Sequence, residues 1–306
     1  MRVFVAGASG AIGARLVSQL IDRGHEVSGT FRSPRTAELL RAAGAAPVAL
    51  DLLDAAAVRA AVLDAAPDAI IHEATALAGG GFTRKLDRGF AQTNRLRTAG
   101  TDALLAAAGQ AGVRRLVAQS FAPYRYARAG GMVKTEEDPL DLEAGTMAQP
   151  VMEAIRHTER TVLAAGGTIM RYGGIYGPGA TDDQLELLRK RQFPLVGSGA
   201  GYSSWVHVDD AVAATVLAVE QKAVGLFNIV DDEPAPAAEW LPYVAACAGA
   251  KPPLRVPVWL ARLLAGEVAV AMMTQGRGFS NAKAKRELGW ELHYPSWRQG
   301  FKEGLA

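Results

Sequence analysis

Cysteine is nearly absent from this chain of 306 residues, in which Cys247 stands alone. A single thiol cannot form an intrachain disulfide or supply the thiolates of a zinc cluster, and we expect no bound metal. The N-terminus runs directly into an apolar segment, without the charged-then-apolar pattern of an export signal. Together these absences indicate a protein of the reducing cytoplasm.

An excess of charge of one sign and long apolar runs are also missing. The 33 basic and 31 acidic side chains give a formal net charge of +2, too small to indicate a nucleic acid or an anionic membrane as partner. The longest apolar stretch, residues 256–273, is interrupted by Arg262 and Glu267. We interpret it as a helix of the core or of a substrate lid rather than a membrane span. A small-molecule substrate is therefore the expected partner.

A glycine-rich turn near the N-terminus lies between an apolar run and an amphipathic segment. Residues 3–6 predict a strand, and Ile12, Leu16 and Leu20 follow at helical spacing. A helix N-terminus has free N–H groups that attract anions, and glycines let a pyrophosphate approach the backbone. A purely structural turn is the alternative. The residues expected to bind a dinucleotide here are Gly7, Ser9, Gly10, Ala11, Ile12 and Gly13.

The second predicted strand, residues 26–31, ends without the acidic residue that holds the ribose 2′-hydroxyl of NAD. Arg32 follows the strand directly, and Arg35 lies close behind. Because a guanidinium suits a 2′-phosphate, the sequence favours NADP(H) over NAD(H) as cofactor. The alternative places both arginines in a solvated turn.

Strands and helices alternate through the first half of the chain with short connections. This alternation is typical of α/β proteins with a doubly wound parallel sheet, the Rossmann architecture. We expect residues 1–172 to form a dinucleotide-binding domain and residues 173–306 a smaller C-terminal α/β substrate lobe, from which the chain can return to the sheet. Strands are predicted over residues 46–50, 68–72, 114–119, 168–172 and 225–230. Helices are predicted over residues 54–66, 92–111, 151–165, 182–191, 209–220, 237–248, 257–273, 281–288 and 296–303.

Further motifs follow along the chain: Asp51-Leu52, Ile71-His72-Glu73-Ala74, Asn94, Gly100-Thr101, Ser120 to Tyr124, Arg171 to Pro178, Val206 to Asp210, and Glu287 to Trp290. With the glycine turn, this ordered set resembles the extended branch of the short-chain dehydrogenase/reductase superfamily. That branch is related to nucleotide-sugar epimerases, dehydratases and 3β-hydroxysteroid dehydrogenases. The resemblance covers nearly the whole chain.

The resemblance implies a role for each motif. Asp51 and Leu52 should frame the adenine, and Ser120 should match the serine that hydrogen-bonds a substrate carbonyl or hydroxyl. Tyr172 should lie near the nicotinamide, and Asn94 is assigned to the cofactor site, with hydrogen-bonded scaffolding as its alternative role. The residues expected along the pyrophosphate and the nicotinamide ribose are Ala74, Thr75 and Ala76. In this family the helices near residues 92–111 and 151–165 often pair between subunits, which favours a homodimer.

One absence separates the chain from that family. The family uses a Tyr followed four residues later by a Lys, whose cation lowers the pKa of the phenol so that it exchanges a proton during hydride transfer. No Tyr-x-x-x-Lys occurs in this sequence, and Val151 and Ile155 stand at the expected positions. The candidate substitutes, each with a structural role as its alternative, are Tyr124, Tyr126, Lys134, Tyr172 and Tyr176, of which Tyr124 and Tyr172 are assigned to the catalytic site.

Two further departures concern the substrate. Nucleotide-sugar enzymes of this type hold the diphosphate with an Asn and an Arg, and Gly174 and Ser203 stand at those positions. Loss of both donors argues against a nucleotide sugar. The second lobe is instead rich in apolar side chains that suit an apolar, aromatic or polyketide-like molecule. They are Trp205, Trp240, Trp259, Leu260, Leu263, Leu264, Met272, Met273 and Phe279.

These features favour an atypical NADP(H)-dependent oxidoreductase that reduces a carbonyl or an activated double bond of a small apolar substrate. Ser120 would polarise the acceptor oxygen, and water or a tyrosine would supply the proton. One alternative is a regulatory protein that binds the dinucleotide without redox chemistry. Another is an isomerase or epimerase that uses the same cleft.

Overall fold

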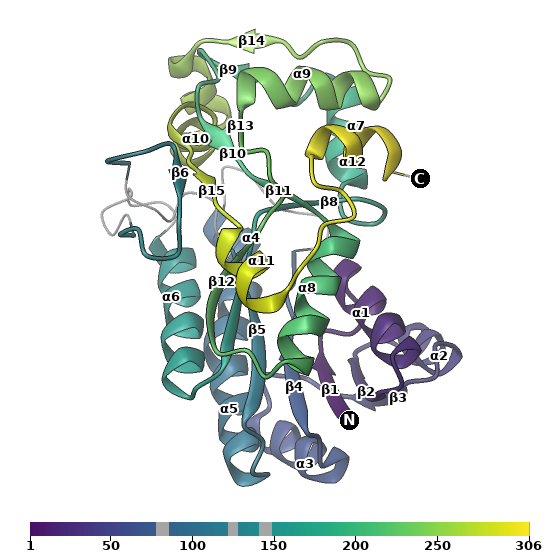
Figure 1. Ribbon diagram of the computed structural model, residues 1–306. Helices are drawn as coiled ribbons and strands as arrows, with labels where there is room; N and C mark the ends of the chain where they lie inside the picture. The colour runs from purple at the N-terminus through teal and green to yellow at the C-terminus, as the bar shows by residue number, and fades with distance from the viewer. Residues whose placement is uncertain (78–85, 122–127, 141–148, 306) are drawn as a thin grey trace.

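The computed structural model describes residues 1–77, 86–121, 128–140 and 149–305. Its centre is a seven-stranded parallel sheet in the order β12-β7-β5-β4-β1-β2-β3 (Figure 1). The strands are β1 (Arg2–Ala6), β2 (Glu26–Phe31), β3 (Ala46–Ala49), β4 (Ala69–His72), β5 (Arg115–Phe121), β7 (Thr168–Tyr172) and β12 (Gly225–Ile229). The predicted doubly wound architecture is thereby confirmed.

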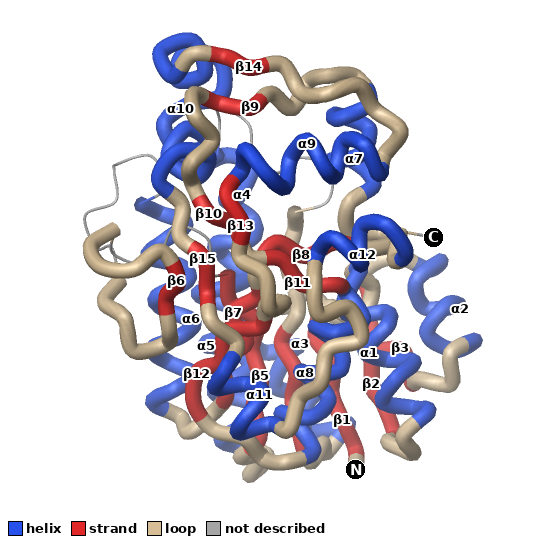
Figure 2. The backbone as a smooth tube through the Cα atoms, turned by 45° about the horizontal axis from the view of Figure 1, so that its top comes forward, coloured by secondary structure: helices blue, strands red, loops and turns tan. Residues whose placement is uncertain are grey.

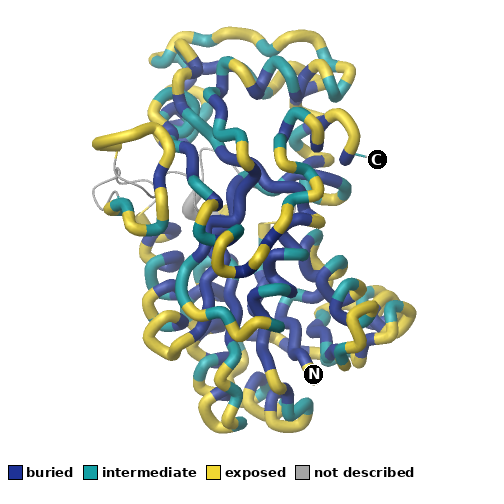
Figure 3. Tube along the Cα trace, in the orientation of Figure 1, coloured by how far each residue is buried: buried dark blue, intermediate teal, exposed yellow. Residues whose placement is uncertain are grey.

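Helices cover both faces of the sheet, because apolar side chains point alternately to either side of each strand. Val3 and Ile71 face one layer, which contains α1 (Ala11–Asp22), α8 (Val208–Glu220) and α11 (Ala282–Leu288). Phe4 and Ile70 face the other layer, which contains α3 (Ala55–Ala65), α5 (Thr101–Gln110) and α6 (Gln149–Ala164). The central strands are therefore buried on both sides (Figure 3).

The single helix expected over residues 92–111 is wrong, because three segments replace it. They are α4 (Leu86–Arg95), the π-helical turn η1 (Leu96–Gly100) and α5. Side chains from other elements bond the carbonyl groups of the π turn: the Thr158 hydroxyl donates to Arg97 O at 2.6 Å, and His72 Nε2 lies 3.3 Å from Leu96 O. These tertiary contacts compensate for the poorer hydrogen bonding within the turn.

A further helix, α2 (Pro34–Ala42), occupies a segment for which the sequence had predicted none. Ser33 caps it by accepting from Thr36 N, and Pro34 stands in its first turn. Arg35 therefore lies on a helix rather than in a turn. The Ser-Pro pair was the signal that could have identified this start.

The remaining helices gather beyond the carboxyl ends of the sheet strands, together with short strand pairs (Figures 1 and 2). The helices are α7 (Asp182–Arg189), α9 (Ala237–Cys247), α10 (Val258–Gln275) and α12 (Trp297–Glu303). The short strands are β6 (Val133–Lys134), β8 (Gly174–Tyr176), β9 (Leu195–Val196), β10 (Tyr202–Ser203), β11 (Trp205–His207), β13 (Ala235–Pro236), β14 (Arg255–Val256) and β15 (Gly278–Phe279). α10 is interrupted at Gly266, which has a φ of 87°.

The chain returns to the sheet after residue 172, because β12 pairs with β7 and α8 packs on α1. The sheet and its helical layers therefore take one strand, β12, and two helices, α8 and α11, from the part of the chain that also builds the lobe. Across the described residues, no helix combines the length and the apolar character needed to cross a membrane.

Candidate active site

The strand order of the sheet reverses between β1 and β4, and the glycine turn lies at their carboxyl ends. Gly7 has a φ of 92°, which L side chains rarely adopt, and a Cβ there would lie 2.5 Å from Ala74 N. A Cβ on Gly13 would lie 2.1 Å from Gly7 O. Both glycines are thus required where the turn meets β4 and α1. Ligands bind at such a reversal in open α/β sheets.

α1 begins directly behind this turn. Gly10 is the N-cap, and no side chain among the described residues caps the first turn of the helix. Ser9 and Gly10 are exposed, Ala11 is half-buried, and Ile12 packs into the core. A Cβ on Gly10 would have no neighbour nearer than 3.6 Å. The helix N-terminus therefore offers open N–H donors to an anion, as a pyrophosphate requires.

A cation follows the end of β2. Arg32 is exposed, and Thr30 Oγ1 accepts from Gly7 N at 3.0 Å, which ties β2 to the glycine turn. Beyond β3, the Asp51 carboxylate accepts from Leu53 N at 3.0 Å, and Leu52 is buried. These residues lie at the carboxyl ends of neighbouring strands, where the adenosine half is expected. Their individual roles stay predictions.

The segment after β4 lies against the glycine turn. Ala74 is buried, Thr75 and Ala76 are half-buried, and Ala76 N donates to Thr93 Oγ1 at 3.0 Å. The next residue on α4, Asn94, has a buried Oδ1 without a hydrogen-bond partner among the described residues. This unpaired acceptor is the second feature, after the glycine turn, that fits a bound nucleotide.

His72 is the last residue of β4, and its side chain reaches the π turn η1. Burial lowers its pKa to about 4, so the imidazole is neutral at physiological pH. Its Nε2 contact with the Leu96 carbonyl favours a scaffolding role for this side chain.

The Ser120 hydroxyl contacts a buried ion pair that Glu159 and Arg171 form. The hydroxyl donates to Glu159 Oε1 at 2.5 Å, and Arg171 donates to both Glu159 oxygens at 2.9 and 2.7 Å. The Ser120 proton is therefore directed to Glu159 and away from a substrate oxygen. These contacts favour a positioning role for Ser120 over the polarising role expected from the sequence.

The start of α6 is apolar where the family's proton-exchanging pair was expected. Val151 and Ile155 are buried in a cluster with Phe90, Met152 and Val268, the last from α10. The second catalytic candidate, Tyr124, lies outside the described residues.

Tyr172 belongs to a polar cluster with Glu73, a residue for which the sequence had predicted no individual role. Its hydroxyl donates to Glu73 Oε1 at 2.9 Å and lies 2.6 Å from Thr215 Oγ1 on α8. Glu73 directly follows β4, and burial raises its pKa to about 8. Burial and the adjacent Glu73 also raise the pKa of Tyr172. The signal for Glu73 in the sequence was a carboxyl group two residues after a short apolar run, Ala69 to Ile71.

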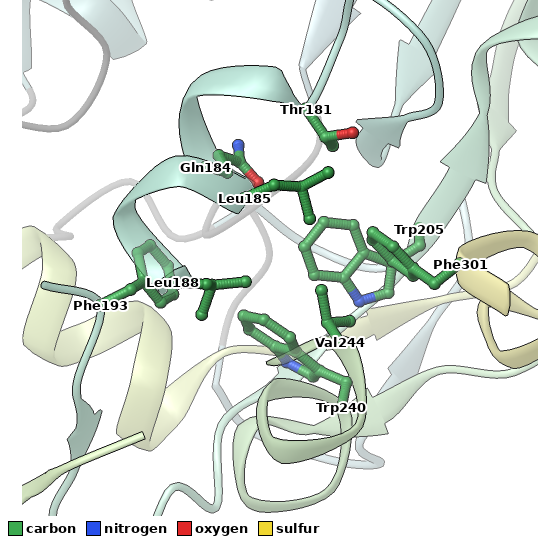
Figure 4. Close-up of a pocket in the computed structure, with 9 residues that line it drawn as sticks. All are labelled: Thr181, Gln184, Leu185, Leu188, Phe193, Trp205, Trp240, Val244 and Phe301. Carbon is green, nitrogen blue, oxygen red and sulfur yellow. The ribbon is translucent and has the colours of Figure 1, made fainter. Parts of the chain in front are cut away.

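The apolar side chains expected to face a substrate differ in their exposure. Trp205, Trp240 and Phe279 are buried, whereas Trp259 and Leu264 on α10 are more than half exposed. Trp205 and Trp240 line a pocket between α7, α9 and α12, and their rings lie 4.8 Å apart (Figure 4). Because these side chains form the core of the lobe, we do not assign the pocket to the reaction.

A doubly wound sheet with a glycine turn at the strand reversal and a lobe over its carboxyl edge defines a Rossmann-type protein of extended form. The NAD dependent epimerase/dehydratase family model matches residues 3–229. The chain belongs to this family, in which it is an enzyme related to epimerases and reductases.

Similar proteins include two reductases. The 3-diazoavenalumate denitrifying reductase of a Streptomyces species is 44% identical over 98% of this chain and 99% of the relative. The 2-alkyl-3-oxoalkanoate reductase of Stenotrophomonas maltophilia is 31% identical over 82% of this chain and 76% of the relative. The UDP-glucose 4-epimerase of Thermotoga maritima, solved with UDP-glucose, superposes with a TM-score of 0.78 at 21% identity, covering 99% of this chain and 97% of that one.

Proposed function

We propose that this protein is an NADP(H)-dependent reductase that acts on a small aromatic molecule. The observation that carries the proposal is the glycine turn, where a pyrophosphate fits against the open N–H groups of α1. Arg32, which stands where NAD-dependent proteins place an acid, supports the phosphorylated cofactor. The reductases among the relatives favour reduction over epimerisation.

The cofactor, when bound, supplies the hydride, and the residues of the chain bind and orient it. The N-terminus of α1 would hold the pyrophosphate, and Arg32 would pair with the 2′-phosphate. Asn94 Oδ1 would accept from a cofactor hydroxyl and so lose its unpaired state. Ser120 would hold Glu159 and thereby fix α6 against β5 and β7.

The apolar cluster at the start of α6 determines which acceptors are suitable. A carbonyl takes hydride on carbon and then needs a proton on oxygen, which Val151 and Ile155 cannot supply. A diazonium carbon takes hydride while dinitrogen leaves, so R–N₂⁺ and hydride give R–H and N₂ without a proton donor. The Streptomyces relative acts on a diazo compound. We therefore place a diazo-bearing arene first, and a ketone or an activated double bond second.

Nucleotide binding tests the cofactor. NADPH is expected to bind at least about tenfold more tightly than NADH, because one charge-assisted hydrogen bond contributes about 1.5–3 kcal/mol. Arg32→Asp is expected to remove this preference. Titrations followed by tryptophan fluorescence measure both dissociation constants.

The matched control for this experiment is Arg41→Asp, which makes the same charge change on an exposed residue at the far end of α2. It should preserve the preference for NADPH. Equal affinities of the wild-type protein for NADPH and NADH would show that the assignment of Arg32 is wrong. A protein that binds neither nucleotide would overturn the proposed function.

Turnover tests the acceptor. We expect NADPH oxidation with an arenediazonium carboxylate to release one N₂ per NADPH, and cofactor deuterated at C4 to leave deuterium on the ring carbon. Absorbance and mass spectrometry follow the two products, and heat-denatured protein gives the spontaneous rate. Faster oxidation with aryl ketones would make a carbonyl the acceptor. Oxidation no faster than the spontaneous rate with every compound would favour the regulatory protein.

A homodimer stays part of the proposal, with the helical segments at residues 92–111 and 151–165 of one subunit packed against those of the other.

A further inference from the structure

The Glu73 cluster is not used by the proposed reduction. Glu73 Oε1 accepts from the Tyr172 hydroxyl, which in turn lies against Thr215 on α8. Oε2 of the same carboxyl is buried, and no hydrogen-bond partner for it exists among the described residues. Native proteins rarely leave a buried carboxyl oxygen unpaired, so this atom calls for an explanation.

The cluster lies beneath the half of the site where the nicotinamide is expected. The strand order reverses between β1 and β4, and Arg32 places the adenosine half over β2. The other half of a dinucleotide must then extend over β4, β5 and β7. Glu73 follows β4 and Tyr172 ends β7, so their hydrogen bond spans this half of the sheet edge.

No cation compensates Glu73 from the elements packed around it in the described structure. Tyr172 on β7 is the titratable group in contact, Thr215 on α8 is neutral, and Gln119 on β5 donates its side-chain amide to the Glu73 carbonyl. The ion pair of Glu159 with Arg171 faces α6, on the opposite side of the sheet. Burial therefore dominates and favours the neutral carboxylic acid, with its pKa raised to about 8.

We propose, resting on the NADP(H) function above, that Glu73 is a proton-releasing site that distinguishes the oxidised from the reduced nicotinamide. Glu73 keeps its proton beside the uncharged reduced ring. Beside the cationic oxidised ring it ionises, and the proton of its carboxyl O–H passes to solvent. The resulting carboxylate strengthens binding of the oxidised cofactor across a medium of low dielectric constant.

The sign of the pH dependence follows from the protonation of Glu73. Below its pKa of about 8 the side chain is neutral, and above that pH a carboxylate already attracts the cationic ring. The ratio of the dissociation constant of NADP⁺ to that of NADPH should therefore fall about tenfold between about pH 7 and pH 9.5. The reason is that pH 7 lies about one unit below the pKa of Glu73, and one unit corresponds to a factor of ten. The 2′-phosphate is common to both nucleotides, so its titration cancels in the ratio.

Calorimetry in two buffers of different ionisation enthalpy counts the protons. Near neutral pH we expect NADP⁺ binding to release up to about one proton from the wild-type protein and NADPH binding to release none. Glu73→Gln keeps an acceptor for the Tyr172 hydroxyl, so it should fold, release no proton and give a ratio independent of pH.

The control variant is Asp231→Asn. Burial also raises the pKa of Asp231 to about 8, but this residue follows β12, three strands or about 14 Å from β4. It should behave as wild type. Unchanged proton release or pH dependence in Glu73→Gln would overturn the assignment of Glu73, and so would binding of both nucleotides to wild type without proton release. Failure of either nucleotide to bind would overturn the NADP(H) function itself.

Discussion

Gly13→Ala is expected to abolish nucleotide binding and to lower the free energy of unfolding by about 3 kcal/mol. The new Cβ would lie 2.1 Å from Gly7 O and 2.9 Å from Ala8 Cα, and all these atoms belong to the backbone. No rotamer change can relieve such a contact, so α1 must shift away from β1. Urea denaturation measures the stability, and fluorescence titration measures the affinity for NADPH.

Gly10→Ala is the matched control for Gly13→Ala. Gly10 has a φ of −74°, which any residue adopts, and a Cβ there meets no atom within 3.6 Å. The stability should change by less than about 0.5 kcal/mol. Because this Cβ would occupy the space in front of the open N–H groups, NADPH binding should weaken. Equal stability of Gly13→Ala and wild type would contradict the steric argument.

Arg171→Met is expected to lower the free energy of unfolding by about 3–5 kcal/mol, because it removes a buried cation that donates two hydrogen bonds to the buried Glu159 carboxylate. The two side chains are 4% and 7% exposed, and two hydrogen bonds join them. Ser120, which donates to the same carboxylate, should lose its fixed orientation. Urea denaturation at neutral pH measures the change.

Two comparisons test the explanation for Arg171→Met. The double variant Arg171→Met/Glu159→Leu should recover most of the lost stability, since the buried carboxylate is then removed together with the cation. Lys190→Met breaks the exposed pair with Glu186 and should cost less than about 0.5 kcal/mol. A double variant as unstable as Arg171→Met alone would show that packing, rather than charge, causes the loss.

Local sequence patterns predicted most of the sheet correctly, because parallel strands buried on both faces are read directly from short apolar runs. The glycine turn was also predictable from local sequence. Only a residue without a Cβ lets the backbone at position 7 approach that of Ala74 so closely. Errors arose where tertiary contacts outweigh local preference. The π turn at residues 96–100 depends on Thr158 and His72, which no periodicity within the helix reveals.

The candidate site was predicted less completely than the fold. Ser120 was identified from its place after a strand, but its partner Glu159 is 39 residues away, so the sequence assigned its hydroxyl to a substrate. Glu73 was quoted only within a motif, because its burial and its bond to Tyr172, 99 residues away, exist only once β4 and β7 share a sheet.

The sequence by itself determined the succession of the sheet strands and of most helices, the position of the glycine turn, the arginine after β2 and the absence of a Tyr-x-x-x-Lys pair. These features are local, and backbone geometry and side-chain chemistry define them within a few residues. The tertiary structure alone decided that the Ser120 hydroxyl donates to the carboxylate of a buried ion pair, and that Glu73 is buried with one oxygen that has no partner among the described residues. Both depend on desolvation and on contacts between distant segments, which form only when helices pack on the sheet.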